Sequence, residues 1–380
     1  MTRIKLREEC DKMFKIPQVR LDRGFELHQA EYEAAALRVL RSGWYILSNE
    51  LDAFEREFAS YVGAKHCIGV GHGLDALWLT FRILGIGKGD EVIVPANTFI
   101  ASVMGITMNG IDATPIFVEP DEYHNIDPSK IEEVITPRTK AILPVHLYGQ
   151  ACDMDTIMAV AKKNDLRVVE DCAQSQGAKQ NGKTTGTFGD VGCFSFYPSK
   201  NLGAFGDAGA VVTDDDDLAQ AFRIYRNYGS EKRYYNMTVG TNSRLDEIQA
   251  ALLRVRLSHL DELNEERKDI CSRYLSTLTN PALTLPTIRL TCDSVWHQFV
   301  VRVKNRECFI DYLKEHNIGT IIHYPIPPHL QECYKYLGHK RGDFPIAEQY
   351  ADEVLSLPLF NGMISDEQDY IIEVINKWQL

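Results

Sequence analysis

Lys200 lies in an unusual setting for a lysine. Residues 193–213, CFSFYPSKNLGAFGDAGAVVT, surround it with aromatic residues, glycines and small apolar residues. Lysine side chains usually carry their charge to water, and a loop lysine that does so is the simpler interpretation. The alternative is a desolvated ammonium group whose pKa falls far enough to give a neutral amine near physiological pH. Such an amine can attack a carbonyl group and form a Schiff base.

A carboxylate and an amide follow another apolar segment. In VVEDCAQSQGA, residues 168–178, Glu170 and Asp171 stand at the carboxyl end of a predicted buried strand. In open α/β sheets this end of the strands borders the ligand crevice. A carboxylate there either caps the next turn or faces a ligand cation. Gln174, three residues further along, is a candidate for a second polar contact.

A glycine-rich turn precedes both segments. GVGHGLDAL, residues 69–77, lies between a predicted strand and a predicted helix, where free backbone N–H groups and the positive end of a helix favour a phosphate. The alternative is that Gly71 and Gly73 serve only a tight turn. The segment does not match the P-loop pattern, and Ala76 takes the place of the third glycine of the dinucleotide-binding pattern. These departures argue against a P-loop enzyme and against a nucleotide-binding oxidoreductase.

Pyridoxal 5'-phosphate (PLP) explains the three segments together. Its phosphate would bind at the turn near Gly73, its aldehyde would join Lys200, and its ring nitrogen would face Asp171. A carboxylate beside that nitrogen keeps it protonated, which makes the cofactor an electron sink. The sequence therefore predicts a PLP-dependent enzyme.

Short apolar segments alternate with helical patterns through the first two thirds of the chain, and these elements would position the three segments. Strands are predicted around residues 66–71, 91–95, 113–120, 141–149 and 167–174, and helices over 73–85, 98–110 and 153–166. The Ser129/Glu132 capping-box pattern predicts the start of one more helix. Strands that are apolar on both faces indicate a mostly parallel sheet covered by helices, so the predicted fold class is α/β.

The pattern changes after residue 213. RLDEIQAALLRVRLSHLDELNEERKDICSRYLSTL, residues 244–278, predicts one long helix, and the segments after it predict a smaller α+β domain. We predict a large cofactor-binding domain over residues 20–250 and a small C-terminal domain over 251–380. Residues 1–19 are expected to form an arm or a part of the small domain.

Composition excludes several classes of partner. The net charge of −12, without a long basic run, argues against nucleic acid. No stretch approaches the roughly 18 consecutive apolar residues of a membrane helix. Nine scattered cysteines without a C-x-x-C pair indicate neither a disulfide framework nor a zinc site. We therefore predict a reduced, cytoplasmic protein without a metal or a membrane segment.

The sequence resembles the DegT/DnrJ/EryC1/StrS family of sugar aminotransferases, within fold type I of the PLP enzymes. VEDCAQSQGA, FSFYPSKNLGAFGDAGAVVT, RNYGS and GTNSRLDEIQAALL are similar to its hallmark segments, and the likeness covers nearly the whole chain. The resemblance implies that Lys200 forms the Schiff base with the cofactor. It also implies that Asp171 pairs with the pyridine nitrogen and that Gln174 lies near the ring hydroxyl.

The resemblance assigns further contacts with the cofactor. It implies phosphate binding by Ser195 and by the N–H groups of Gly73 and Leu74, and ring stacking by Phe99 in PANTFIAS. Asn242 matches the asparagine that reaches the phosphate of the neighbouring subunit's cofactor, which implies a homodimer with shared sites.

Two positions bear on how closely the sequence follows the family. His72 stands where Ser or Asn is more usual, so the side-chain contact at the phosphate turn is left open. A branch of dehydratases carries histidine in place of the lysine, and Lys200 argues against that branch.

The resemblance also implies a substrate class. L-Glutamate would donate the amino group, and a nucleotide-linked keto-sugar would accept it. The loop GTIIHYPIPPHLQ, residues 319–331, offers His323, Tyr324 and His329 to the hexose, and Lys232 and Arg233 are candidates for the diphosphate. For both groups a structural or solvent-exposed role is the alternative.

The form of this loop is most similar to enzymes that aminate C3 of a dTDP-3-keto-6-deoxyhexose. Such a product would serve deoxyamino-sugar biosynthesis for a glycan, such as lipopolysaccharide O-antigen or an S-layer. Amination at C4 of a dTDP-4-keto-6-deoxyhexose is the main alternative. A PLP-binding protein without catalysis is a further one.

Overall fold

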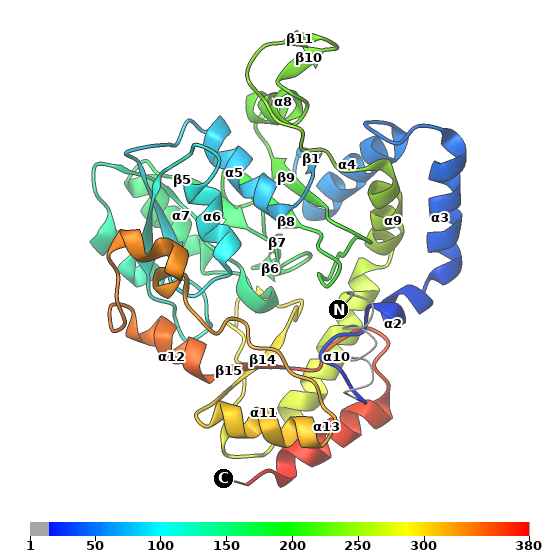
Figure 1. Ribbon diagram of the computed structural model, residues 1–380, viewed down its shortest axis with the longest axis vertical. Helices are drawn as coiled ribbons and strands as arrows, with labels where there is room; N and C mark the ends of the chain where they lie inside the picture. The colour runs from blue at the N-terminus through cyan, green and yellow to red at the C-terminus, as the bar shows by residue number, and fades with distance from the viewer. Residues whose placement is uncertain (1–14, 380) are drawn as a thin grey trace.

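The computed structural model describes residues 15–379, and its centre is a seven-stranded sheet (Figure 1). The strands run in the order β1-β9-β8-β5-β4-β2-β3. Every neighbouring pair is parallel except the two that include β9. The strands are β1 (His66–Val70), β2 (Glu91–Pro95), β3 (Thr114–Val118), β4 (Thr139–Ile142), β5 (Arg167–Asp171), β8 (Val191–Ser195) and β9 (Gly209–Thr213).

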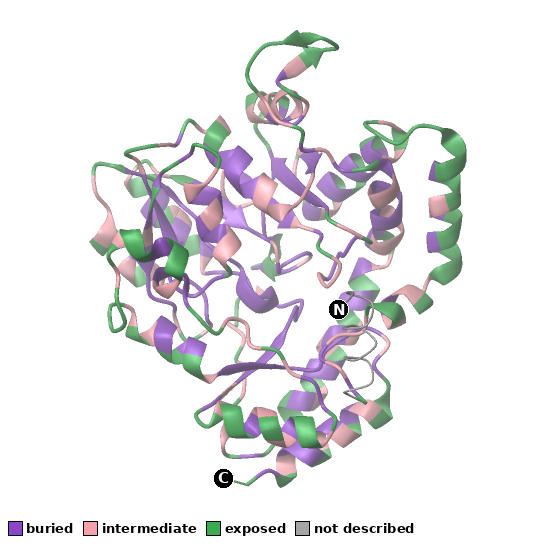
Figure 2. Cartoon of the chain, viewed as in Figure 1, coloured by how far each residue is buried: buried purple, intermediate pink, exposed green. Residues whose placement is uncertain are grey.

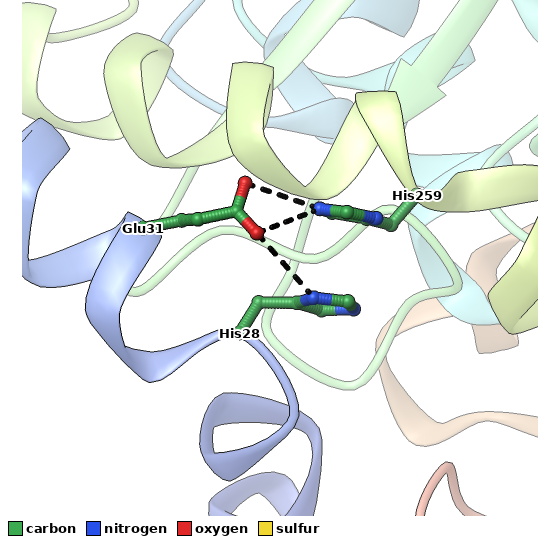
Figure 3. A group of neighbouring side chains, drawn as sticks. All are labelled: His28, Glu31 and His259. Atoms are coloured by element: carbon green, nitrogen blue, oxygen red, sulfur yellow. Dashed lines mark hydrogen bonds and ion pairs between the residues drawn. The ribbon is translucent and has the colours of Figure 1, made fainter.

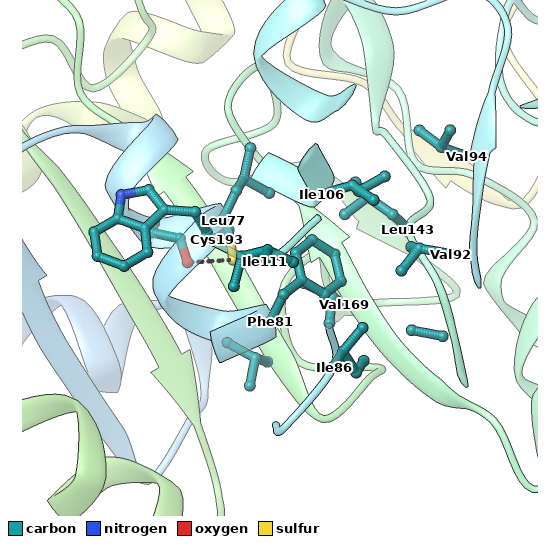
Figure 4. Packing of buried hydrophobic residues seen from close by; sticks show 14 of the residues in the cluster. Leu77, Phe81, Ile86, Val92, Val94, Ile106, Ile111, Leu143, Val169 and Cys193 are labelled. Carbon is teal, nitrogen blue, oxygen red and sulfur yellow. Dashed lines mark hydrogen bonds between the residues drawn. The ribbon is translucent and has the colours of Figure 1, made fainter. Parts of the chain in front are cut away.

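Helices cover both faces of this sheet, as the apolar strands predict. In β2, Val92 and Val94 pack into the core on one face while Ile93 packs into the core on the other, because successive strand residues point to opposite faces. Figure 4 shows part of the first core, where Phe81 lies near Cys193 and Val169. The helices on that face are α5 (Gly73–Ile83), α6 (Ile100–Thr107) and α8 (Asp216–Tyr225), and those on the other are α4 (Asn49–Val62), α7 (Met154–Lys163) and α9 (Glu247–Ser258). The predicted α/β class with a mostly parallel sheet is confirmed.

The C-terminal part forms a separate core around a small antiparallel sheet of β12 (Leu283–Thr284), β14 (Phe299–Val303) and β15 (Val354–Leu357). Ile16, from the N-terminal segment, packs into this core and pairs with Ile318. We therefore propose that the small domain includes the described residues before 20 together with the C-terminal part. The helices of this part are α10 (Leu260–Thr277), α11 (Arg306–Glu315), α12 (Pro345–Glu353) and α13 (Ser365–Lys377). Residues 1–14 lie outside the described residues.

Two sequence-based predictions of helices need correction. The long helix predicted over 244–278 is two helices, α9 and α10, separated at His259. The helix predicted after Ser129 is a pair of short 3₁₀ turns at 128–130 and 132–134. Asp127 rather than Ser129 caps the first turn, because its carboxylate accepts the Ser129 N–H.

Helices α2 (Leu21–Glu26) and α3 (Gln29–Ser42), which follow residues 1–19 and are called the N-terminal arm from here on, contact the chain at the break at His259. Glu31 of α3 contacts His259 Nε2 at 3.1 Å, and His28 Nδ1 lies 3.8 Å from the same carboxylate (Figure 3). The two imidazole rings stack with their centroids 3.7 Å apart. This cluster places the arm beside α9 and α10.

Several small elements complete the described chain. The short strands β6 (Lys179–Gln180), β7 (Lys183–Thr184) and β13 (Cys292–Asp293) form one small sheet. β10 (Ser230–Lys232) and β11 (Tyr235–Asn236) form a hairpin that projects from the large domain (Figure 1). Figure 2 shows that this hairpin and the outer side of α3 are largely exposed. Among residues 15–379, no helix combines the length and the apolarity that a membrane crossing requires.

Candidate active site

A cavity of about 680 Å³ opens at the carboxyl ends of β5 and neighbouring strands. Most of the residues predicted to bind the cofactor lie in its wall: Gly73, Leu74, Phe99, Asp171, Gln174, Ser195 and Lys200. These residues come from four separate segments of the large domain, and the fold brings the segments together. The cavity is the candidate active site.

Asp171 ends the central strand β5 and is almost completely buried. Burial raises the pKa of its carboxyl group, and hydrogen bonds from the Ser102 hydroxyl (2.7 Å) and the Ala173 N–H (3.1 Å) oppose that rise. Thr98 is in turn within 2.8 Å of Ser102. The carboxylate is therefore held in one orientation at the cavity wall.

Lys200 follows β8 in the loop that closes the same cavity. Burial lowers the pKa of Lys200 to about 8, against the opposing effect of the Asp171 charge. A substantial fraction of its amine is therefore neutral at slightly alkaline pH. This agrees with a nucleophilic role for Lys200 rather than with a solvated surface lysine.

The N-terminus of α5 and Ser195 form a close-packed cradle. A Cβ atom built on Gly73 would lie 2.5 Å from Ser195 Cβ, so only glycine permits this approach. The first N–H groups of a helix have no acceptor within the helix and can bind a phosphate. His72 Nδ1 accepts the Asp75 N–H at 3.0 Å, so His72 caps α5 as the usual smaller polar residue could. The cradle, Asp171 and Lys200 fit the phosphate, ring nitrogen and aldehyde of PLP.

Gln174 and Tyr324 link the two domains at this cavity. Gln174 accepts the Tyr148 N–H at 2.7 Å and donates to the Tyr324 hydroxyl at 3.1 Å. The Tyr324 ring lies 5.0 Å from the half-exposed ring of Phe99, centroid to centroid. Both rings line the cavity, which agrees with the predicted stacking role of Phe99.

The two histidines of the 319–331 loop have different environments. His323 lines the cavity, and its Nδ1 lies 2.8 Å from the Ser356 hydroxyl. His329 does not line the cavity: it is buried, and its Nε2 contacts Glu348 at 3.1 Å, with Phe117 and Phe344 against its ring. The structure therefore does not bring His329 to the cavity, and its contacts agree with the structural alternative.

Three other predicted residues lie outside the cavity of this chain. Lys232 and Arg233 are on the exposed β10–β11 hairpin, each with its cation over a neighbouring tyrosine ring. Asn242 is exposed and forms a bridge with Asn227. Lys232 and Arg233 do not reach the cavity of their own subunit, because the hairpin projects away from the sheet. The contact of Asn242 with the neighbouring subunit's cofactor stays a prediction.

Sequence reasoning missed several residues of the cavity. Ser102 and Thr98, which orient Asp171, flank Phe99 in the PANTFIAS segment at the start of α6. His297 also lines the cavity, and its Nδ1 lies 3.1 Å from Asn201 Oδ1. A search for hydroxyls near the strand-to-helix turn could have found the first two, whereas His297 comes from a distant segment.

A comparison with protein families identifies the chain. The model of the DegT/DnrJ/EryC1/StrS aminotransferase family matches residues 27–376. The chain belongs to this aminotransferase family. The resemblance read from the motifs is thereby confirmed, as is the prediction of an enzyme that transfers amino groups.

Individual relatives of this aminotransferase cover nearly its whole length. It is 55% identical to dTDP-3-amino-3,6-dideoxy-alpha-D-galactopyranose transaminase of Aneurinibacillus thermoaerophilus. The 352 compared residues cover 92% of this chain and 96% of the relative. The crystal structure of DesV from S. venezuelae in complex with a ketimine intermediate has a TM-score of 0.93 and 46% identity, covering 96% of this chain and 98% of that one. The structure of NtdA from Bacillus subtilis with bound cofactor PMP has a TM-score of 0.88 and 31% identity, covering 95% of this chain and 84% of that one.

These relatives bear on the cofactor of the aminotransferase. PMP is the amine form of PLP, and it is bound in the Bacillus subtilis structure. The predicted cofactor is therefore confirmed.

Proposed function

We propose that the protein transfers the amino group of L-glutamate to C3 of a dTDP-3-keto-6-deoxyhexose. The observation that carries the proposal is the single cavity in which Lys200, Asp171 and the Gly73–Ser195 cradle meet. The Aneurinibacillus relative, at 55% identity, is named for a sugar aminated at C3, which supports this position over C4.

Lys200 is the proposed carrier of protons in both half-reactions. The bound cofactor supplies an electron sink for the negative charge that develops at the reacting carbon. In the first half, the neutral Lys200 amine removes the proton from Cα of glutamate. In the second half, its ammonium form returns a proton to C3 of the sugar. A pKa of about 8 allows one side chain to serve as base and acid.

Asp171 is the proposed partner of the cofactor's ring nitrogen. Its carboxylate is fixed by Ser102 and by the Ala173 N–H, so it needs no reorganisation when the cofactor binds. Gln174 is assigned to the ring hydroxyl and Phe99 to the ring face. His323 and Tyr324 remain the proposed contacts of the hexose, because both line the cavity next to Phe99.

A second copy of the chain is proposed to complete the site. Asn242 is exposed outside the cavity of its own subunit, as is expected for a residue that reaches the neighbouring cofactor. Lys232 and Arg233 would contact the sugar diphosphate in the same way, from the projecting hairpin. Large apolar side chains are exposed in and just after α3 (Leu40, Trp44 and Tyr45) and in and just after the hairpin (Tyr234, Met237 and Val239).

The proposed product is a building block for deoxyamino-sugar glycans, including lipopolysaccharide O-antigens. We also propose a cytoplasmic location. The cysteines within residues 15–379 are all free, and most of them are buried, as is expected in a reducing compartment.

The first test is a half-reaction. Purified protein loaded with PLP and mixed with L-glutamate should lose the absorbance of the lysine-bound cofactor and gain that of the amine form. Lys200→Ala should lose turnover by about a thousandfold or more, while Lys140→Ala, an exposed lysine of β4, should retain it. An unchanged spectrum of the wild type would favour a cofactor-binding protein without turnover.

A further inference from the structure

A second cavity adjoins Lys200 on the side of the N-terminal arm. Its volume is about 410 Å³, and it shares Ser199 and Lys200 with the cofactor cavity. Residues of α2 form one wall, and the loop after Lys200 forms another. Figure 1 shows α2 beside α9 and α10, and a Cβ atom built on Gly24 would lie 3.4 Å from Arg256 Nη1. A small ligand in this cavity would therefore lie next to Lys200.

Two arginines of this second cavity have no carboxylate partner. Arg256, on α9, donates from Nε to the Asn201 carbonyl at 2.8 Å. Arg267, on α10, is almost completely buried and donates to Asn361 and to the Trp296 carbonyl, each at 3.2 Å. Neither arginine forms an ion pair within the described part of the chain. Buried guanidinium groups without a counterion are uncommon, because burial of an unpaired charge is costly.

The side chains that line the second cavity carry more positive than negative charge. Among the described residues that line it, Asp22 is the sole carboxylate, and it is hydrogen-bonded to Arg20. Burial and the neighbouring Arg256 charge lower the pKa of Arg267 to about 10. The two guanidinium groups therefore repel one another in the empty protein, and an anion between them would relieve that repulsion.

We propose that Arg256 and Arg267 bind a carboxylate group of the amino donor. This inference rests on the proposed function, because glutamate is the dicarboxylate that the reaction would consume. Planar guanidinium groups match a carboxylate through paired N–H donors. Ser199 and Lys200 line both cavities, so a donor bound to the arginines would lie beside Lys200, the residue proposed to act on Cα of the donor. The keto-sugar nucleotide has no carboxylate, and its diphosphate is assigned above to Lys232 and Arg233 of the hairpin rather than to this arginine pair.

The test measures the two half-reactions separately, with L-glutamate added to PLP-loaded protein and the keto-sugar nucleotide added to PMP-loaded protein. Arg256→Gln should lower the apparent second-order rate constant with L-glutamate about tenfold or more, because a charge-assisted contact is lost. The rate with the keto-sugar nucleotide should stay within about twofold, since no carboxylate is involved. Arg256→Lys should recover part of the glutamate rate. Arg254→Gln, on the same helix but paired with Glu50 and Glu57, is the matched control and should behave as the wild type.

Calorimetric titration with glutarate provides a readout that does not need catalysis. Glutarate should bind the wild-type holoenzyme, and Arg256→Gln should weaken that binding about tenfold or more. Equal glutarate affinity and equal glutamate rates in the wild type and Arg256→Gln would overturn the proposal. A wild type that binds glutarate through Arg256 but shows no half-reaction would support the anion site and contradict the proposed function.

Discussion

Lys200 shows how much of the chemistry depends on the environment of one residue. Its sequence context predicted a lysine with a lowered pKa, and the structure supplies the cause, which is burial opposed by the nearby carboxylate of Asp171. An ordinary lysine with a pKa of 10.5 would be almost wholly protonated at neutral pH, whereas a pKa of about 8 leaves a usable neutral fraction. The proposed Schiff-base role therefore depends on the site rather than on lysine itself.

The pH dependence of cofactor capture tests this cause. Below its pKa the Lys200 ammonium cannot attack the PLP aldehyde, and above it the amine can. The rate of Schiff-base formation in apoenzyme should therefore rise with pH, with a midpoint near 8, and then level off. In Asp171→Asn the midpoint should move to lower pH, because the Asp171 charge raises the pKa of Lys200. Stopped-flow absorbance across a pH series measures both midpoints. A wild-type midpoint near 10.5, or an upward shift in the variant, would contradict this explanation.

The strands and helices differ in how well the sequence pattern predicts them. The strands were predictable because apolar runs such as 91–95 need burial on both faces, and β2 covers those same residues. The break at His259 could not be predicted, because the helical pattern continues through it. The contacts of His259 with Glu31 and His28 join segments far apart in the sequence. The 128–134 segment was overpredicted for a related reason: Asp127 offers a local turn in place of a capping box.

The residues of the candidate site also differ in whether the sequence alone could predict them. Residues adjacent to a strand end, such as Asp171 and Lys200, could be predicted from local context and from the family motifs. The different places of His323 and His329 could not, because both stand in one proline-rich loop and only tertiary packing buries His329 against Glu348.

The start of α5 provides a test at the element scale. Gly73→Ala would place a methyl group against Ser195, so the helix and β8 must separate and the phosphate cradle must widen. The affinity of apoenzyme for PLP should fall about tenfold or more. Gly87→Ala is the matched control, because its nearest neighbour is 3.4 Å away. Fluorescence titration with PLP compares the two variants, and equal affinities would argue against the close-packed cradle.

The whole molecule is expected to work as a pair of subunits. Several of its large exposed apolar side chains lie on the arm and in or just after the hairpin. The hairpin precedes Asn242, the residue that the resemblance connects with a shared site. The proposal that the neighbouring subunit completes the cavity accounts for both the pair of subunits and the position of Asn242 outside its own cavity.

Subunit complementation tests that shared site. Lys200→Ala and Asn242→Asp should each be nearly inactive alone. Refolding them together should restore about a quarter of the wild-type sites, because half of the dimers are mixed and each mixed dimer has one site without either defect. Assay of the mixture against each variant alone measures the gain. Activity no greater than the sum of the separate variants would place Asn242 outside the neighbouring site.

The most direct measurement of the proposed function is the position of the transferred nitrogen. The PLP enzyme would be incubated with ¹⁵N-labelled L-glutamate and a dTDP-3-keto-6-deoxyhexose, and the product examined by NMR. We predict ¹⁵N bonded to C3 of the hexose, with 2-oxoglutarate as the co-product. Nitrogen found at C4 with a 4-keto substrate, and none transferred to the 3-keto sugar, would contradict the proposal.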